Sequence, residues 1–122
     1  MDKPTLKKYI SLMLTGVSEI EGLENNDVIF VTSIGYITGK PLSEEETQEN
    51  SKITSDNTLY WVTKNITDDY RKEYNITEEP IDGNDGYIIL KDVTIKYLNS
   101  TTKLGSLILF FDQIIGVTFG NI

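Results

Sequence analysis

The side chains that could carry chemistry in this chain are mostly carboxylates, because the sequence contains no histidine and no cysteine. It therefore offers no thiolate nucleophile and no imidazole, the usual general base and metal ligand. Paired carboxylates alone can hydrolyse glycosides, which is the enzymatic alternative. The acids of this chain lie mostly in polar stretches where water solvates them. We therefore predict no enzyme, and no catalytic, cofactor-binding or metal-binding residue.

Two acidic clusters raise the question of cation binding. Three consecutive glutamates occupy residues 44–46, and a solvated charge run is the usual explanation of such a triplet. Residues 80–86 combine aspartates with turn-forming residues. An EF-hand loop needs an oxygen ligand at position five and glutamate at position twelve, but counting from Asp82 puts glycine at five and Val93 at twelve. The calcium pattern fails, and the stretch is predicted to be a turn.

Length and charge limit the function further. The chain has 122 residues, with 19 acids and 11 bases for a formal net charge of −8. This length suits a single domain with a modest core. The negative charge repels nucleic acid phosphates at long range. The N-terminus lacks a signal-peptide pattern and no apolar run is long enough to span a bilayer, so we expect a cytoplasmic protein without a membrane partner.

The N-terminal segment has the apolar spacing of an amphipathic helix. Asp2 precedes Pro4, as a capping residue precedes a proline in the first turn. Apolar side chains then recur every three or four residues, which predicts a helix over about residues 3–15 that docks on the core. A membrane-surface helix is the less favoured alternative, because only three lysines would serve it. The apolar residues are Leu6, Tyr9, Ile10, Met13, Leu14 and Val17.

Residues 28–42 have the composition of two strands. The first, residues 28–32, is rich in β-branched and aromatic side chains. Residues 33–35 are expected to turn the chain into a second strand that contains Gly39. A glycine inside a strand often marks a sharp bend, as in small barrels.

Residues 43–81 are predicted to be an insertion. Ile53 is the only apolar residue of its first part, 43–57, which we expect to be a mobile, solvated loop that is dispensable for folding. The next part is ambiguous. Residues 59–62 favour a strand, and apolar residues at four-residue spacing favour a short helix over about 67–74. Strand followed by helix is the preferred division, although the sequence leaves the choice open across the whole segment.

The C-terminal part carries most of the apolar content. Residues 86–97 alternate between apolar and polar in their second half and predict a strand. Residues 106–111 and 114–119 predict two more, joined by a tight turn or a bend. The last 19 residues carry a single charge, Asp112. Such a run must lie in a core or be covered by a partner.

The order of these elements resembles the Sm-like family, whose fold is an N-terminal helix on a strongly bent five-stranded barrel. The similarity is carried by VIFVTSIGYITG at residues 28–39, then by residues 87–95 and 104–117. The resemblance implies one domain over residues 1–122, mainly β with an N-terminal helix (α+β). Its Sm-like or SH3-like barrel would use strands within about 28–42 and 86–119, with 43–81 as a long inserted loop or helix. The alternative fold is one antiparallel sheet covered by the N-terminal helix.

The family's RNA-binding motifs have no clear counterpart here. Phe110 and Phe111 stand where the last family motif shows Arg-Gly, and Tyr87 falls near its asparagine. RNA binding is therefore not implied. What the resemblance does imply is a barrel whose open edges pair with neighbouring copies, often as a ring.

The sequence thus favours a non-enzymatic interaction or scaffold module of Sm-like type that forms homo-oligomers through edge strands. The strand over 106–111 is apolar on both faces, as expected of a strand that is covered twice. The predicted interface residues are Leu107, Ile108, Leu109, Phe110, Phe111, Ile115 and Val117.

The alternative function is binding of RNA or single-stranded nucleic acid, which the net charge disfavours. It requires basic residues gathered on one face beside exposed aromatic side chains. The candidate basic residues are Lys40, Lys64, Arg71, Lys91 and Lys103.

Overall fold

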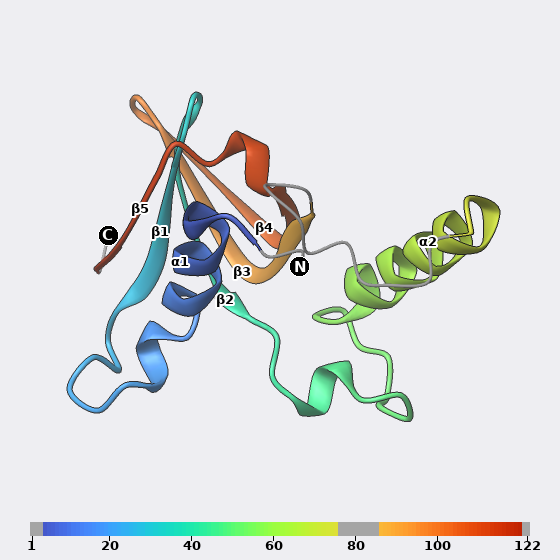
Figure 1. Cartoon of the computed structure of the whole chain (residues 1–122). Helices are drawn as coiled ribbons and strands as arrows, with labels where there is room; N and C mark the ends of the chain where they lie inside the picture. Colours follow the sequence, from blue (N-terminus) through green and yellow to red (C-terminus); the bar gives the residue numbers. More distant parts are fainter. Residues whose placement is uncertain (1–3, 76–85, 121–122) are drawn as a thin grey trace.

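The computed structural model describes residues 4–75 and 86–120, and these residues form a five-stranded sheet with two α-helices (Figure 1). The strands are β1 (Asp27–Thr32), β2 (Gly35–Pro41), β3 (Tyr87–Tyr97), β4 (Ser100–Phe110) and β5 (Gly116–Gly120). The α-helices are α1 (Leu6–Leu14) and α2 (Thr58–Glu73), and three short 3₁₀ helices are η1 (Val17–Glu19), η2 (Glu45–Thr47) and η3 (Phe111–Gln113).

The sheet has the strand order β4-β3-β2-β1-β5, and every neighbouring pair is antiparallel. This confirms a mixed α+β fold that is mostly β. Within the described residues β4 does not pair with β5, so these strands form the two edges and the sheet is not closed. The Sm-like or SH3-like barrel that we expected is therefore not confirmed, because main-chain pairing stops at β4 on one side and at β5 on the other.

Glycines shape the sheet at the two places where the sequence suggested a turn and a bend. Gly35 ends the turn between β1 and β2 with a φ of 143°, and a Cβ there would lie 2.2 Å from the carbonyl oxygen of Lys96. Gly39 lies where the pairing of β2 with β3 shifts register. A Cβ at Gly39 would lie 3.0 Å from the Cβ of Leu90. Both backbones approach too closely for a larger residue.

The core lies between the sheet and the segment that follows β4. The apolar C-terminal run supplies much of it, because the 3₁₀ turn η3 folds Phe111 and Ile114 inward until each is at most 2% exposed. Of the two alternatives for residues 112–113, a tight turn or a bend, the structure shows the tight turn. The buried cluster consists of Val28, Phe30, Ile37, Ile88, Leu90, Val93, Leu109, Phe111 and Ile114.

The N-terminal helix forms, but its apolar face does not dock on the core as predicted. Its buried residues are Lys8 and Ser11. Phe111 and Ile114 already fill the core beside the helix, and the ammonium group of Lys8 lies 5.2 Å from the centre of the Phe111 ring. Only the end of the predicted face is covered, at Leu14 and Val17. The exposed members of that face are Leu6, Tyr9, Ile10 and Met13.

The start of α1 also differs from the expectation. The hydroxyl of Thr5 accepts a hydrogen bond from the backbone N–H of Lys8 at 3.2 Å, which makes Thr5 the capping residue. The proposed cap, Asp2, lies outside the described residues. So does the turn predicted over residues 80–86, except for Gly86.

The ambiguous segment is a single helix, so the strand expected over residues 59–62 is wrong. In the first turn of α2 the N–H of Trp61 donates to the carbonyl oxygen of Asn57 at 3.1 Å. The helix predicted over 67–74 is therefore the second half of α2. The helical hydrogen bonds of α2 run through residues 59–62 and outweigh the β propensity of these residues.

Residues 43–57 are more ordered than the sequence suggested. The Asn57 side chain is buried, accepts a hydrogen bond from the N–H of Thr54 at 2.7 Å, and donates to the carbonyl oxygens of Glu46 and Lys52 at 3.0 and 3.1 Å. The Lys91 side chain on β3 donates to the Glu46 carboxylate at 2.7 Å. Because the segment is folded around Asn57 and tied to the sheet, we now expect its replacement by a linker to cost stability.

Candidate functional site

Four of the seven predicted interface residues face the chain's own core. Leu109 and Phe111 are buried within it, and Leu107 and Val117 are partly buried against it. Their apolar surface is covered within a single chain. The alternation along β4 was predicted correctly, but one of its two faces is internal.

The other three predicted residues lie nearer the surface. Phe110 is 54% exposed at the end of β4, and its ring meets that of Tyr87 edge-on at 6.1 Å. Ile115, just before β5, is 69% exposed. Ile108 is half-buried and lines an apolar hollow of about 220 Å³ beside the β1–β2 turn. Of the seven predicted interface residues, Phe110 and Ile115 therefore offer the most apolar surface to a partner.

The unpaired edges of β4 and β5 are the main feature of this candidate site. Tyr97 and Ser100 flank the two-residue turn that joins β3 to β4. Pairs in such a hairpin alternate between hydrogen-bonded and non-hydrogen-bonded. The even-numbered residues of β4 therefore bond to β3, and the odd-numbered residues, such as Gly105 and Leu107, direct their main-chain N–H and C=O groups to the open edge.

The two halves of the β4 edge differ in chemistry. Its first half, Ser100 to Gly105, is exposed and includes Lys103. Exposed polar residues and lysine protect an edge against indiscriminate pairing. Its second half is apolar and ends at Phe110. A partner strand therefore fits best beside residues 105–110.

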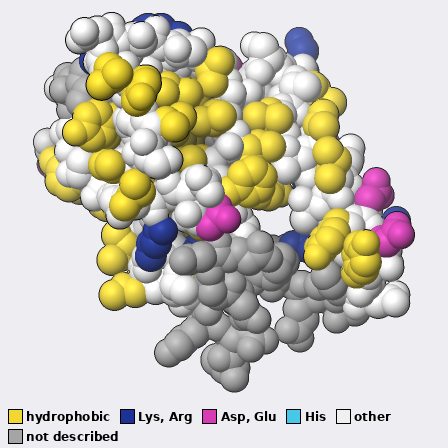
Figure 2. Space-filling model, turned by 90° about the horizontal axis from the view of Figure 1, so that it is seen from above, with side chains coloured by type: hydrophobic (Ala, Val, Ile, Leu, Met, Phe, Trp, Pro, Cys, Tyr) yellow, Lys and Arg dark blue, Asp and Glu magenta, His cyan; other side chains and the backbone are white. Residues whose placement is uncertain are grey.

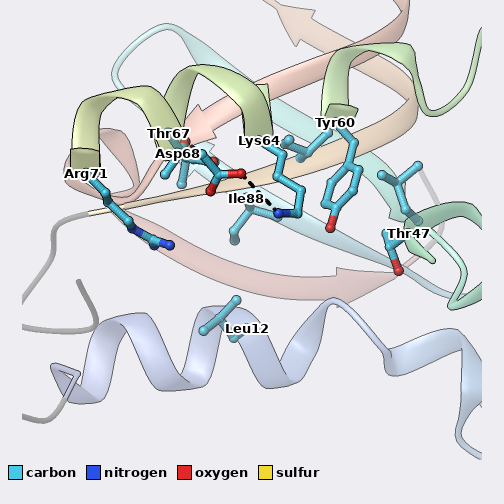
Figure 3. A pocket seen from close by; sticks show the side chains of 11 residues that line it. Leu12, Thr47, Tyr60, Lys64, Thr67, Asp68, Arg71 and Ile88 are labelled. Carbon is cyan, nitrogen blue, oxygen red and sulfur yellow. Dashed lines mark hydrogen bonds and ion pairs between the residues drawn. The ribbon is translucent and has the colours of Figure 1, made fainter. Parts of the chain in front are cut away.

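A pocket of about 400 Å³ lies between α1, α2 and β3 (Figure 3). Leu12 points into it from α1, opposite the Lys64 and Asp68 side chains of α2, which form an ion pair at 3.3 Å. The hydroxyl of Thr67 donates to the Thr63 carbonyl oxygen at 2.8 Å and is 2.9 Å from the Tyr87 hydroxyl, which therefore donates to it. The other lining residues are Leu42, Thr47, Tyr60, Arg71, Ile88 and Ile89.

The described lining of this pocket offers groups for hydrogen bonding and ion pairing. Among these described residues the one carboxylate is that of Asp68, which is paired with Lys64. In the described parts of the chain, no group of three or more acids is placed to hold a metal ion. The glutamate triplet at 44–46 instead uses one member, Glu46, in the pair with Lys91.

The Glu46–Lys91 pair is the clearest electrostatic feature of the described residues. The hydrogen bond from Lys91, followed by that from the Ser43 N–H, lowers the pKa of Glu46 below its ordinary value. The hydrogen bond to Glu46 raises the pKa of Lys91. Both side chains are about four-fifths buried, with exposures of 20% and 17% for Lys91 and Glu46. The pair holds η2 against β3 and so forms one wall of the region beside the pocket.

The basic residues needed for nucleic acid binding are largely engaged with acids. Lys40 pairs with Asp27 at 3.0 Å, and Lys64 and Lys91 are paired as described above. These contacts neutralise part of the charge that phosphate binding would need. A gel-shift titration at low salt is the direct check of the nucleic acid alternative.

One sequence pattern could have predicted the polar lining of the pocket, but the assignment of this segment followed its apolar residues instead. Lys64, Asp68 and Arg71 follow each other at four- and three-residue spacing, which places them on one face of a helix. Once residues 58–73 are recognised as a helix, a polar inner face follows. The contact between Glu46 and Lys91 had no such signal, because the two residues are far apart in the chain.

Comparison with known proteins adds no relative. No family model matches the chain, and no curated protein and no solved structure matches it significantly. In the part of the chain that the structure describes, no helix is long and apolar enough to cross a membrane.

Proposed function

We propose that the protein is a non-enzymatic interaction module that assembles with copies of itself through the two edges of its sheet. The observation that supports this is the strand order, which leaves β4 and β5 as edges without a partner strand in the described residues. Unpaired N–H and C=O groups on an exposed strand pair readily with another strand. The two edges of one sheet can therefore serve as complementary halves of a single contact.

Pairing of β4 with β5 of the next copy would be a head-to-tail contact. Such heterologous contacts form a ring when the rotation between copies closes, and a filament when it does not. The Sm-like resemblance, with its helix and edge-pairing barrel, favours the ring. The protein would then act as a scaffold whose surface is multiplied around the assembly.

The side chains at the edges support the same arrangement. Phe110 and Ile115 are the large apolar side chains beside the edges that remain more than half exposed. A neighbouring strand would cover them and add their burial to the main-chain hydrogen bonds. The residues of β4 before Gly105 would stay in water, which limits the contact to residues 105–110.

Proline at Gly105 is the sharpest test. Gly105 lies between the pairs Val93–Leu104 and Lys91–Ser106, so the alternation of the ladder predicts that its N–H points outward, and a Cβ at this residue meets nothing within 4 Å. Gly105→Pro therefore removes an edge donor without a clash inside the chain. We expect size-exclusion chromatography with light scattering to show a multiple of the chain mass for the wild type and a smaller species for Gly105→Pro.

The matched control is Gly105→Ala, which keeps the N–H and should keep the wild-type mass. Circular dichroism should show the same fold in all three proteins. A wild type that is strictly monomeric across micromolar concentrations would overturn the proposal. So would a Gly105→Pro variant that retains the full mass.

A further inference from the structure

Both α-helices turn an apolar side to solvent, while polar side chains such as Lys8 and Ser11 of α1 and Asp68 of α2 lie on the sides toward the rest of the chain. The outer face of α1 consists of Leu6, Tyr9, Ile10 and Met13, which are 40–74% exposed. The outer face of α2 consists of Val62, Ile66, Tyr70 and Tyr74, which are 50–65% exposed. Surface helices of a stable monomer normally bury this side, so two exposed apolar faces indicate an interaction surface.

We propose that these two faces cover each other between two copies of the protein. In this arrangement α2 of one copy lies on α1 of the other, and a two-fold axis repeats the contact in the opposite sense. The contact does not depend on strand pairing, and it would produce a closed pair, since an isologous contact uses the same surface on both copies.

The two outer faces cannot meet within one chain. Leu12 of α1 and Lys64 of α2 face each other across the pocket, so the sides that the helices turn to each other are the inner ones (Figure 3). The outer faces lie outside this gap, on sides of the helices that solvent reaches. Figure 1 shows α2 standing to one side of the sheet, where a second molecule can reach it.

The area of the two faces favours a reciprocal contact. An aromatic side chain buries about 150–250 Å² when fully covered, so each of the three half-exposed tyrosines offers roughly 100 Å². The aliphatic and methionine side chains offer about half of that each. Covering both faces would bury roughly 500–600 Å² of side-chain surface per copy, near the lower limit of about 600 Å² per partner for a specific interface. One face alone would give about half, which is typical of weak crystal contacts.

Charge decides which helix pairs with which. Within Leu6–Leu14, α1 has no acidic residue, and Lys7 lies beside its outer face. Asp69 and Glu73 lie exposed beside the outer face of α2, and Figure 2 shows hydrophobic side chains beside acidic ones where α2 lies, at the right of the molecule. Placing α2 on α1 brings opposite charges together, whereas antiparallel pairing of α2 with itself would bring Asp69 close to its own copy.

The same charges disfavour a lipid surface as the occupant. Lys8 of α1 is buried, and the acids beside the outer face of α2 would be repelled by anionic lipid headgroups. A second copy satisfies both helices at once, whereas a membrane would attract one and repel the other.

Complementary charge variants test the proposal in the full chain. Met13→Glu and Ile66→Lys each place on one outer face a charge of the same sign as the charge beside the facing helix, at side chains that are 60% and 63% exposed, so neither should disturb the fold. Each variant alone should lose the contact and show half the wild-type mass by light scattering. When the two are mixed, one contact is formed by unaltered faces and the other by lysine against glutamate. The mixture should therefore regain the wild-type mass.

Lys72→Gln is the matched control, because Lys72 is exposed on another side of α2 and its loss makes the same change in charge as Met13→Glu. It should leave the mass unchanged. Wild-type mass for both single variants would overturn the proposal, and failure of the mixture to recover would exclude the reciprocal pairing of α1 with α2. A wild type that stays monomeric but floats with phosphatidylserine vesicles would overturn it in favour of a membrane.

The same measurements separate this contact from the edge pairing. If Gly105→Pro keeps the full mass while Met13→Glu halves it, the edge contact fails and the helix contact holds. If Gly105→Pro lowers the mass while Met13→Glu leaves it unchanged, the edge contact alone is supported. Combining Gly105→Pro with Ile66→Lys should give a monomer when both contacts exist.

Discussion

The sheet of this protein buries its large apolar side chains, whereas the two α-helices expose many of theirs. In the sheet, Phe30, Leu90 and Phe111 are at most 1% exposed, and the chain covers them itself. On the helices, the most regularly spaced apolar side chains point to solvent. The difference shows that apolar periodicity identifies a face that needs covering, while the rest of the fold decides whether the cover comes from the same chain.

The two regions also differ in how they are held. The sheet is held by apolar packing around its core together with its hydrogen-bonded strand ladders. The region from η2 to α2 is attached largely through polar contacts, such as those of Asn57, the Glu46–Lys91 pair and the bond between the Thr67 and Tyr87 hydroxyls. The sheet should therefore be the more stable unit, and the helical insertion the more sensitive to pH.

Adjacent phenylalanines provide the largest test of this comparison. Phe111→Ala removes a ring from the core and should lower the free energy of unfolding by about 3–5 kcal/mol. Phe110→Ala removes a ring that is 54% exposed and should cost less than half as much in the monomer, while weakening the assembly. Urea denaturation of the two variants measures the difference. Equal losses would mean that Phe110 is as internal as Phe111.

Glycine positions test the sheet more locally. Gly35→Ala places a Cβ 2.2 Å from the Lys96 carbonyl oxygen in a backbone with a φ of 143°, so the β1–β2 turn must shift. We expect a loss of about 2–3 kcal/mol in thermal or urea unfolding. Gly105→Ala, which meets nothing within 4 Å, should change stability by less than about 0.5 kcal/mol. A tolerated Gly35→Ala would show that the turn is not rigid.

Most of the sheet could be predicted from the sequence because its signals are local. Alternation located β3, and the glycine turn between residues 32 and 36 located β1 and β2. The tip of β4 was missed, since Ser100 to Lys103 are polar residues that join the strand only because β3 extends beside them. Sheet closure could not be judged from any local pattern, because it depends on the distance between two edges.

The helices show why the candidate site was harder to predict. The spacing of Leu6 and Ile10 correctly gave a helix, but it carried no information on whether Phe111 had already filled the core beside it. Leu109 was predicted to be an interface residue because the strand is apolar on both faces. The structure shows that its side is internal, which only the packing of the sheet could reveal.

The smallest expected effect concerns the Glu46–Lys91 pair, which joins the two regions. The folded state lowers the pKa of Glu46 below its ordinary 4.5, so the pair contributes stability that is fully present above about pH 5 and is lost as the pH falls through the lowered value. The pKa of Lys91 is raised above 10.5, so the contribution is also lost when the pH rises through that higher value. A charged hydrogen bond of this kind contributes about 1.5 kcal/mol.

Glu46→Gln should therefore lower the free energy of unfolding by about that amount at pH 7, and this difference (the gap to the wild type) should shrink below pH 4. Glu45→Gln, at an exposed neighbour, should show no such gap. A gap that stays constant from pH 7 to pH 3 would mean that the insertion is held to the sheet by contacts other than this pair.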